Sequence, residues 1–323
     1  MKEKTKSSSN MLSRVTFLLV ASLLFPFSIP AQKYWPVIDI LSPSWGPVDM
    51  LVTIKGQHFG EPQANSTVTF NGTQAKPTSW SDTQIVTPVP DGATTGVVRI
   101  AVNGTTKSQG NYPMFTVVTD SVFIQKIQAG DAEAITIAGR SGDQRFVPYL
   151  KRELENHKAK GNRFAGSWPT ELALARLGQT DQLQEVWCRA ITDDPKHGLW
   201  PSTYQLELVG GWFAIRGIEK LLTPEGLIRW HKPSKEEINS DAHSMPFFVT
   251  ALETLPKVVP NPPIIPVRVT PELDRQLSPD WVTKIWQDWI AAHKDELSKL
   301  QPTGEGVDFS SDACKKGKPV KKK

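Results

Sequence analysis

The chain has few cysteines, and this scarcity limits the folds it can adopt. Only Cys188 and Cys314 occur among its 323 residues. Two cysteines cannot staple a disulfide-dense scaffold, and a zinc site would need more ligands than they supply. Cys188 lies among apolar residues, where a free cysteine behaves as a small hydrophobe, whereas an oxidising compartment would permit one bridge to Cys314. The sequence leaves both states open.

The chain also lacks the short motifs that carry catalysis. It contains no glycine-rich phosphate loop, and no two of its six histidines lie four residues apart, the spacing that places two metal ligands on one helical face. Asp241, His243 and Ser244 are close in sequence, but a catalytic triad is assembled by the fold, so their proximity is not evidence for one. We therefore predict no catalytic residue, no cofactor, no metal site and no enzymatic activity.

Three carboxylates keep one catalytic alternative open. Glu171, Glu207 and Glu219 could supply an acid and a base to a glycan-processing helical domain, if two of them faced each other across a cleft. Charges in solvent or at helix ends are the commoner explanation. Glu171 follows Pro169 and Thr170 and fits the first turn of a helix, next to the positive end of the helix dipole. The distance between the carboxylates separates the two explanations.

Positive charge is concentrated at the two ends of the chain. The net charge is +4, residues 1–31 carry four positive charges and one negative charge, and six lysines lie between Lys315 and Lys323. Residues 32–314 therefore carry a net charge of −5, which argues against a basic nucleic-acid-binding face. We expect residues 301–323 to form a disordered basic tail, whose Lys315 to Lys323 could contact an anionic surface weakly.

The first 31 residues have the order of an export signal. Basic residues precede an apolar run from Val15 to Ile29, and Ala31 follows it closely. Pro26 interrupts the run, which is shorter than the ~20 residues that a bilayer-spanning helix needs. We predict a signal peptide over residues 1–31, no transmembrane segment after its cleavage, and a periplasmic, cell-envelope or extracellular location.

Residues 36–118 carry the pattern of a small β-sandwich. Apolar and polar side chains alternate over residues 52–55 and 98–102, which places one set of each strand on a buried face. Asn-Gly pairs follow at 71–72 and 103–104, and both residue types tolerate the positive φ that a type I′ hairpin turn demands. The sequence therefore predicts half-buried strands joined by tight turns.

The motifs of this stretch resemble those of the IPT/TIG family. A proline, a Gly-Pro pair, an alternating strand and Gly-x-x-Phe-Gly occur in that order in SPSWGPVDMLVTIKGQHFG, and WSDTQI and PVPDG follow later. The resemblance covers about a quarter of the chain. It implies an immunoglobulin-like β-sandwich that binds or spaces other molecules.

Two tryptophans of this module are the candidates for contact with a partner. Trp45 and Trp80 lie beside predicted turns, where exposure is plausible, and tryptophan is favoured at binding hot spots. Tryptophan is also highly buried on average, so either ring could instead fold over the end of the sandwich. We take Trp45 and Trp80 as the candidate partner-binding residues.

From residue 121 onward, apolar residues recur at helical spacing. Gly142 and Gly178 lie 36 residues apart, and each separates an apolar helix from an amphipathic one. The segments IAGRSGDQRFVPYL and LARLGQTDQL resemble HEAT repeats. This resemblance implies that residues 121–255 form a short, irregular, armadillo-like α-solenoid with a concave surface for a protein partner; an irregular helical bundle is the alternative.

The C-terminal part begins with a proline-rich stretch that cannot continue a helix, so we expect an extended connector over residues 256–278. A helix over residues 279–300 follows and should cap the solenoid. Its predicted buried face is widened by Trp286 and Ile290 and is centred on Trp281, Ile285, Trp289, His293, Leu297 and Leu300.

These patterns predict a multidomain fold, all-β and then all-α, in which an immunoglobulin-like sandwich precedes a HEAT-like solenoid. We predict an exported, non-enzymatic binding or scaffold protein with a protein partner and no nucleic-acid partner. The alternative is a secreted polysaccharide-binding or glycan-active protein that docks through the sandwich. Its motivation is the 11 tryptophans beside an export signal.

Overall fold

The computed structural model describes residues 35–61, 65–105, 112–159, 167–191, 203–222, 254–263 and 279–315. The predicted signal peptide lies outside the described residues, as do residues 264–278 of the predicted connector, residues 316–323 of the tail, and Asp241, His243 and Ser244. Within the described ranges, no helix is both long and apolar enough to cross a bilayer.

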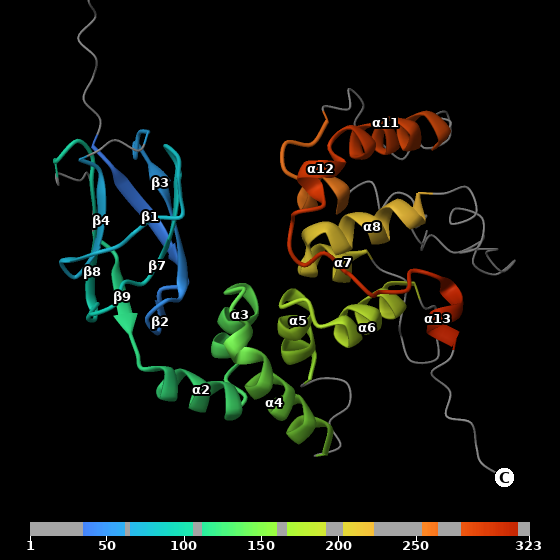
Figure 1. Ribbon diagram of the computed structural model, residues 1–323, viewed down its shortest axis with the longest axis horizontal. Coiled ribbons are helices and arrows are strands. Elements are labelled where there is room, and N and C mark those ends of the chain that lie inside the picture. The colour runs from blue at the N-terminus through green and yellow to red at the C-terminus, as the bar shows by residue number, and fades with distance from the viewer. Residues whose placement is uncertain are drawn as a thin grey trace, which may run out of the picture.

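Two β-sheets form the N-terminal part of the molecule (Figure 1). One sheet has the strand order β1 (Val37–Ser42), β3 (Leu51–Gln57), β7 (Gln84–Pro88), β6 (Ser79–Trp80). The other has the order β2 (Trp45–Gly46), β9 (Met114–Val117), β8 (Gly96–Ala101), β4 (Thr67–Phe70), β5 (Thr73–Gln74). Named strand pairs are antiparallel except β2 and β9, which run parallel. The predicted two-sheet, β-rich domain is confirmed.

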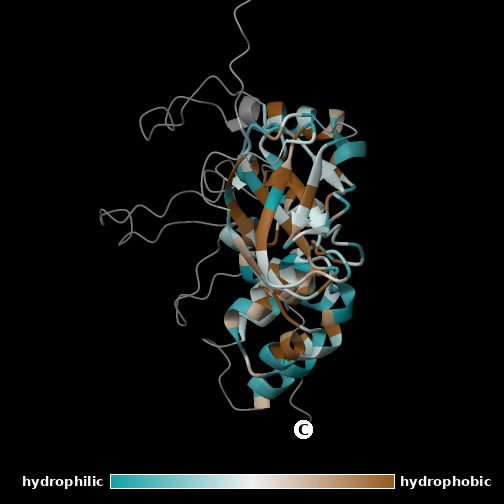
Figure 2. Cartoon of the chain, turned by 90° about the vertical axis from the view of Figure 1, so that its left-hand side faces the viewer, coloured by the Kyte–Doolittle hydropathy of each residue, from teal (hydrophilic) through white to brown (hydrophobic). Residues whose placement is uncertain are grey.

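The alternation of side chains builds the core between the sheets. Val52 and Ile54 of β3 and Val98 and Ile100 of β8 are buried, while their neighbours in sequence are less so, as expected for strands with one face on the core. Figure 2 shows hydrophobic and hydrophilic residues mixed along the strands in this way. The aromatic rings at the centre, Phe70 and Phe115, meet edge to face with centroids 5.3 Å apart.

The two Asn-Gly turns have the backbone geometry that the sequence predicts. Asn71 and Gly72 have φ of 45° and 90°, and Asn103 and Gly104 have φ of 52° and 74°. The first pair joins β4 to β5, and the second lies inside an isolated bridge between residues 102 and 105. These turns fix the ends of the two hairpins.

A helical region follows the sheets. Its labelled elements are α2 (Asp120–Gln128), α3 (Ala132–Arg140), the 3₁₀ turn η1 (Gln144–Phe146), α4 (Val147–Ala159), α5 (Trp168–Arg176), α6 (Thr180–Ile191), α7 (Tyr204–Val209), α8 (Gly211–Leu221), α11 (Pro279–Ala292), α12 (Lys294–Leu297) and α13 (Ser311–Lys315). Residues 254–258 are also helical, so a helix continues into the first three residues of the predicted extended connector. Gly142 and Gly178 follow α3 and α5 with φ of 71° and 76°, so the helix ends predicted at these glycines are confirmed. The regular stacking of a HEAT solenoid stays a prediction.

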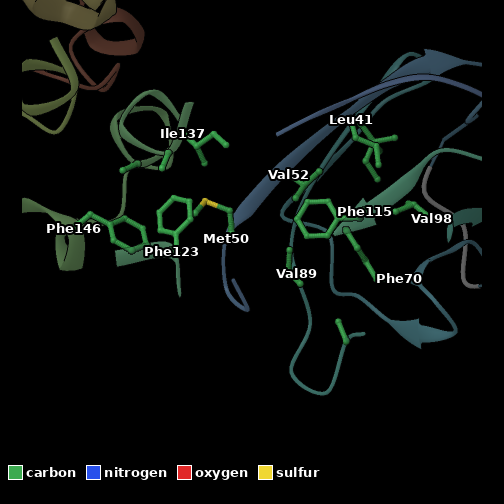
Figure 3. Close-up of a cluster of buried hydrophobic side chains, with 14 of the residues drawn as sticks. Leu41, Met50, Val52, Phe70, Val89, Val98, Phe115, Phe123, Ile137 and Phe146 are labelled. Carbon is green, nitrogen blue, oxygen red and sulfur yellow. The ribbon is translucent and has the colours of Figure 1, made fainter. Parts of the chain in front are cut away.

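One hydrophobic core extends from the sandwich into the helices. Buried residues of both sheets and of α2 to α5 form a single cluster. Phe123 of α2 is at its centre: the ring is fully buried, and its centroid lies 5.3 Å from that of Trp45 and 5.0 Å from that of Phe146. Figure 3 shows Met50 of the sandwich pointing at the same ring. We placed a domain boundary between residues 118 and 121, and the core crosses it without interruption.

A second core lies between α5 and the C-terminus. It is built on α6, α8 and α11, with Trp187, Phe213 and Trp286 as its largest buried side chains. Ala173 and Leu174 of α5 belong to the first core and Ala175 to the second. Helix α5 therefore separates and connects the two cores.

The C-terminal helix differs from the predicted one in length and orientation. It divides into α11 and α12 at His293, whose Nδ1 lies 2.8 Å from the Trp289 carbonyl oxygen and whose ring stacks on Trp289. Trp286 and Ile290 are almost fully buried, whereas Trp289 is half-buried. Within α11 the buried face is thus centred on the residues that we placed at its margin, whereas Leu297 of α12 is buried as predicted.

Residues 301–315 pack against the helices, where we expected a disordered tail. We call them the C-terminal strap. Phe309 lies between Trp187 and Phe213, with centroid distances of 5.2 and 5.6 Å. The side-chain amide of Gln184 exchanges two hydrogen bonds of 2.9 Å with the backbone of Asp308. A disulfide between Cys188 of α6 and Cys314 closes the strap, which decides between the two cysteine states that the sequence left open.

We predict that Phe123→Ala lowers the free energy of unfolding by about 3 to 5 kcal/mol, because it opens a cavity where the sandwich meets the helices. Urea denaturation, followed by far-UV circular dichroism and by tryptophan fluorescence, measures the change. The neighbouring substitution Val122→Ala is the control, since Val122 is 41% exposed and should cost less than about 0.5 kcal/mol. Equal costs for the two variants would show that the shared core is not what holds the parts together.

We predict that replacing Cys188 and Cys314 by serine destabilises the folded state by about 2 to 4 kcal/mol, since the bridge closes a long loop, with 126 residues of sequence separation. Limited proteolysis should then cut the strap faster than any site in the sheets. Dithiothreitol should reproduce both effects in the unmodified protein and change nothing in the double variant; sensitivity of the double variant to the reductant would contradict the assignment.

Candidate functional site

Trp45 lies at the joint between the sandwich and the helices. It belongs to β2 and is half-buried. Its indole Nε1 donates a hydrogen bond of 2.8 Å to Oε1 of Glu133 at the start of α3, and the ammonium of Lys126 lies 5.3 Å from its ring centroid. Lys126 also pairs with Asp131 at 3.1 Å. The polar end of Trp45 thus completes a charged rim around the buried ring of Phe123.

One acidic residue of this rim, Asp131, is also the residue that caps a helix. Asp131 is the N-cap of α3, and its carboxylate accepts a hydrogen bond from the Ala134 backbone N–H at 2.9 Å. This bond, followed by the hydrogen bond from Lys126, lowers the pKa of Asp131. The Asp131 carboxylate is therefore stabilised in its charged form, in which it pairs with Lys126.

Trp80 is folded over one end of the sandwich. Its Nε1 donates to the carbonyl oxygens of Phe59 and Gly60, at 3.2 and 3.0 Å. The carboxylate of Asp82 accepts a hydrogen bond from the Gly60 N–H at 2.9 Å. A Cβ on Gly56 would collide with the Phe59 ring. The two sequence motifs that carry the IPT/TIG resemblance, Gly-x-x-Phe-Gly and Trp-Ser-Asp, are therefore two sides of one packed corner.

Both tryptophans thus have structural contacts, and their role toward a partner stays a prediction. Sequence could place them beside turns because turn residues are local. It could not reveal the contact of Trp45, because Glu133 lies 88 residues further along the chain.

Two of the three candidate carboxylates, Glu171 and Glu207, are held in separate ion pairs, and the third, Glu219, lies half-buried on α8. Glu171 is buried and lies 2.6 Å from Arg189, whose guanidinium covers the ring of Trp168 at 5.3 Å. Glu207 pairs with Lys257 at 2.9 Å. The side chains therefore differ in environment and in partner, which is typical of packing contacts between helices.

Glu153 is a buried carboxylate that the sequence did not single out. Its two oxygens contact Thr170 Oγ1 and, at 3.2 Å, His157 Nδ1. The Thr170 hydroxyl donates a hydrogen bond to Glu153, so both Thr170 and His157 contact the same carboxylate. Among the described residues, no group of three or more histidine, cysteine, aspartate or glutamate side chains is arranged to hold a metal ion.

Two arginines form a positive spot on the helical region. Burial, and next the like charge of Arg140, lowers the pKa of Arg176 to about 10. The Nε of Arg176 donates to the Leu208 carbonyl oxygen at 2.8 Å. Sequence reasoning missed this pair, although each arginine lies two residues before a glycine that ends a predicted helix.

The N-terminal module combines two antiparallel-rich sheets, a packed corner at Gly56 and two Asn-Gly turns. Residues 36–117 match the IPT/TIG domain. This match confirms the resemblance seen in the sequence and covers the first part of the chain only. No curated protein matches the chain.

Two solved structures are similar to part of the chain. One is the γ-cyclodextrin glucanotransferase (γ-CGTase) of the alkalophilic Bacillus clarkii, with 31% identity over 28% of this chain and 13% of that chain, and a TM-score of 0.22. The other is a putative phosphatase of Bacteroides thetaiotaomicron, with 24% identity over 27% and 17% of the two chains and a TM-score of 0.21. The chain therefore spans less than a fifth of the length of either protein.

We predict that Trp45 and Glu133 are energetically coupled across the joint between the IPT/TIG domain and α3. In a double-mutant cycle with Trp45→Phe and Glu133→Ala, the coupling free energy should be about 0.5 to 1.5 kcal/mol, because each change removes the same hydrogen bond. Chemical denaturation provides the four stabilities. Trp80→Phe, combined with Glu133→Ala, is the matched cycle and should give additive effects. Additivity in both cycles would refute the coupling.

Proposed function

We propose that the protein is an exported, non-enzymatic binding or scaffold protein, and that its helical region presents a surface to a protein partner in the cell envelope or outside the cell. The IPT/TIG match favours a binding or scaffold role. The disulfide between Cys188 and Cys314 is consistent with an oxidising compartment. The export signal predicted at residues 1–31 points to the same location.

The shared hydrophobic core is the observation that carries this proposal. Phe123 and Trp45 fix the IPT/TIG domain on α2 and α3, so the domain does not sit on a free linker. A rigid support of this kind holds a recognition surface in one orientation and lowers the entropy lost on binding. The carboxylates of Glu153, Glu171 and Glu207 also support a rigid helical region, because each contacts a side chain on another element.

The polysaccharide alternative rests on the tryptophans of the sandwich. In this alternative, the partly exposed rings of Trp45 and Trp80 would stack on sugar rings. Both indole N–H groups already have acceptors within the protein, which favours the scaffold role for these two residues.

We predict that the mature chain, residues 32–323 with its disulfide intact, retains a discrete protein from the envelope fraction of the producing organism, and that unlabelled protein competes for it. Cross-linking followed by mass spectrometry should place the cross-links on α3 to α8. The same preparation should release no reducing ends from a panel of polysaccharides. Reducing-end release that is lost in Glu219→Gln or Glu207→Gln would contradict the proposal and establish the glycan-active alternative.

A further inference from the structure

Arg140 and Arg176 end two neighbouring helices and lie close together. Arg140 is the last residue of α3, and Arg176 is the last residue of α5. Gly139 brings these helices into close contact, because a Cβ at this position would lie only 2.5 Å from the Cα of Ala173. The basic ends of α3 and α5 are therefore fixed side by side, as Figure 1 shows for the two helices.

A third helix completes the arrangement. The Nε of Arg176 donates to the carbonyl oxygen of Leu208 in α7 at 2.8 Å. Leu208 lies two residues before Gly210, as Arg140 and Arg176 lie two residues before Gly142 and Gly178, and these three glycines have φ between 71° and 76°. Equivalent positions of α3, α5 and α7 thus meet along one edge of the helical region, and two of the three carry a positive charge.

The acidic side chains named so far on the elements around this edge have other partners. Glu133 of α3 accepts a hydrogen bond from Trp45. Glu171 of α5 pairs with Arg189, Glu207 of α7 with Lys257, and Asp143 with Arg145. In the part of the chain that the structure describes, neither Arg140 nor Arg176 has an acidic partner. The dipole of each helix favours a cation at its C-terminus, but it does not account for two cations placed next to each other. Unfavourable charge arrangements of this kind concentrate at functional sites.

We infer that Arg140 and Arg176 form a binding site for a carboxylate on an acidic segment of the protein partner, an inference that rests on the function proposed above. A guanidinium group presents two parallel N–H donors that match the two oxygens of a carboxylate. Arg140 is exposed and Arg176 is half-buried, so an anion can approach from solvent and contact both. The bound carboxylate supplies the negative charge that the site lacks.

The test uses acetylated hexaglutamate as the probe at low ionic strength, with binding measured by isothermal titration calorimetry. Every protein in the series carries glutamine at the six lysines of residues 315–323, which removes the attraction of the basic tail. Arg140→Gln and Arg176→Gln should each weaken binding about tenfold or more, as expected when a hydrogen bond to a charged group is lost. Arg152→Gln is the matched control, because Arg152 is an exposed arginine of α4, and it should leave the affinity unchanged.

Three outcomes would overturn the inference: no binding of hexaglutamate, an equal loss of affinity in Arg152→Gln, or binding of an oligogalacturonate but not of hexaglutamate, which would assign the site to an acidic glycan. A structural role is tested separately. Arg140→Gln should keep or raise the melting temperature, because it removes a repulsion, whereas an arginine needed for folding would lower it. Hexaglutamate binding without any retained protein would leave the arginine site standing and refute only the proposed function.

Discussion

The burial of Phe123 between the IPT/TIG domain and the helices is the contact on which the rest of the structure depends. Strand β9 leads into α2 with no free linker: the Val118 N–H donates to the Gly46 carbonyl oxygen at 3.1 Å, and Thr119 caps the helix. Phe123 is then placed against Trp45 and Met50 within a single turn of α2. Complete burial of a phenylalanine contributes about 2 to 3 kcal/mol. The domain therefore gains its orientation and part of its core from residues outside the stretch that defines the family.

Helix α5 connects this first core to the core of the C-terminal half of the molecule. Ala173 faces α3, whereas Ala175 faces the core of α6 and α8. Thr170 and Glu171, in the first turn of α5, reach in opposite directions, to Glu153 of α4 and to Arg189 of α6. Pairs of buried side chains therefore join α5 to α4 and to α6. The C-terminal strap in turn packs on α6 and α8 through Phe309. Each part is thus stable mainly through its contact with the next.

Sequence predicted what depends on local spacing and missed what depends on distant contacts. The alternation of β3 and β8, the turns at Asn71 and Asn103, and the helix ends at Gly142 and Gly178 follow from residues within a few positions of each other. The strap was misjudged because its proline, glycine and charge content is that of a mobile tail, while its fixation depends on Phe309 and Cys314 meeting α6 more than a hundred residues earlier. The arginine pair was missed for the same reason. Helical spacing places each arginine at a helix end, but only the close approach at Gly139 brings the two together.

A like-charge pair at a tightly packed helix contact opposes folding, since neither arginine has an acidic partner within the described ranges and Arg176 is half-buried. Two contacts hold the helix ends together against this repulsion. Gly139 of α3 packs closely on Ala173 of α5, and Arg176 donates a hydrogen bond to the Leu208 carbonyl oxygen. An anion bound between the two guanidinium groups would offset this repulsion. The joint at Phe123 fixes the orientation of the helices relative to the sheets. The two arginines, which have no acidic partner among the described residues, would supply the positive charge for the inferred carboxylate site.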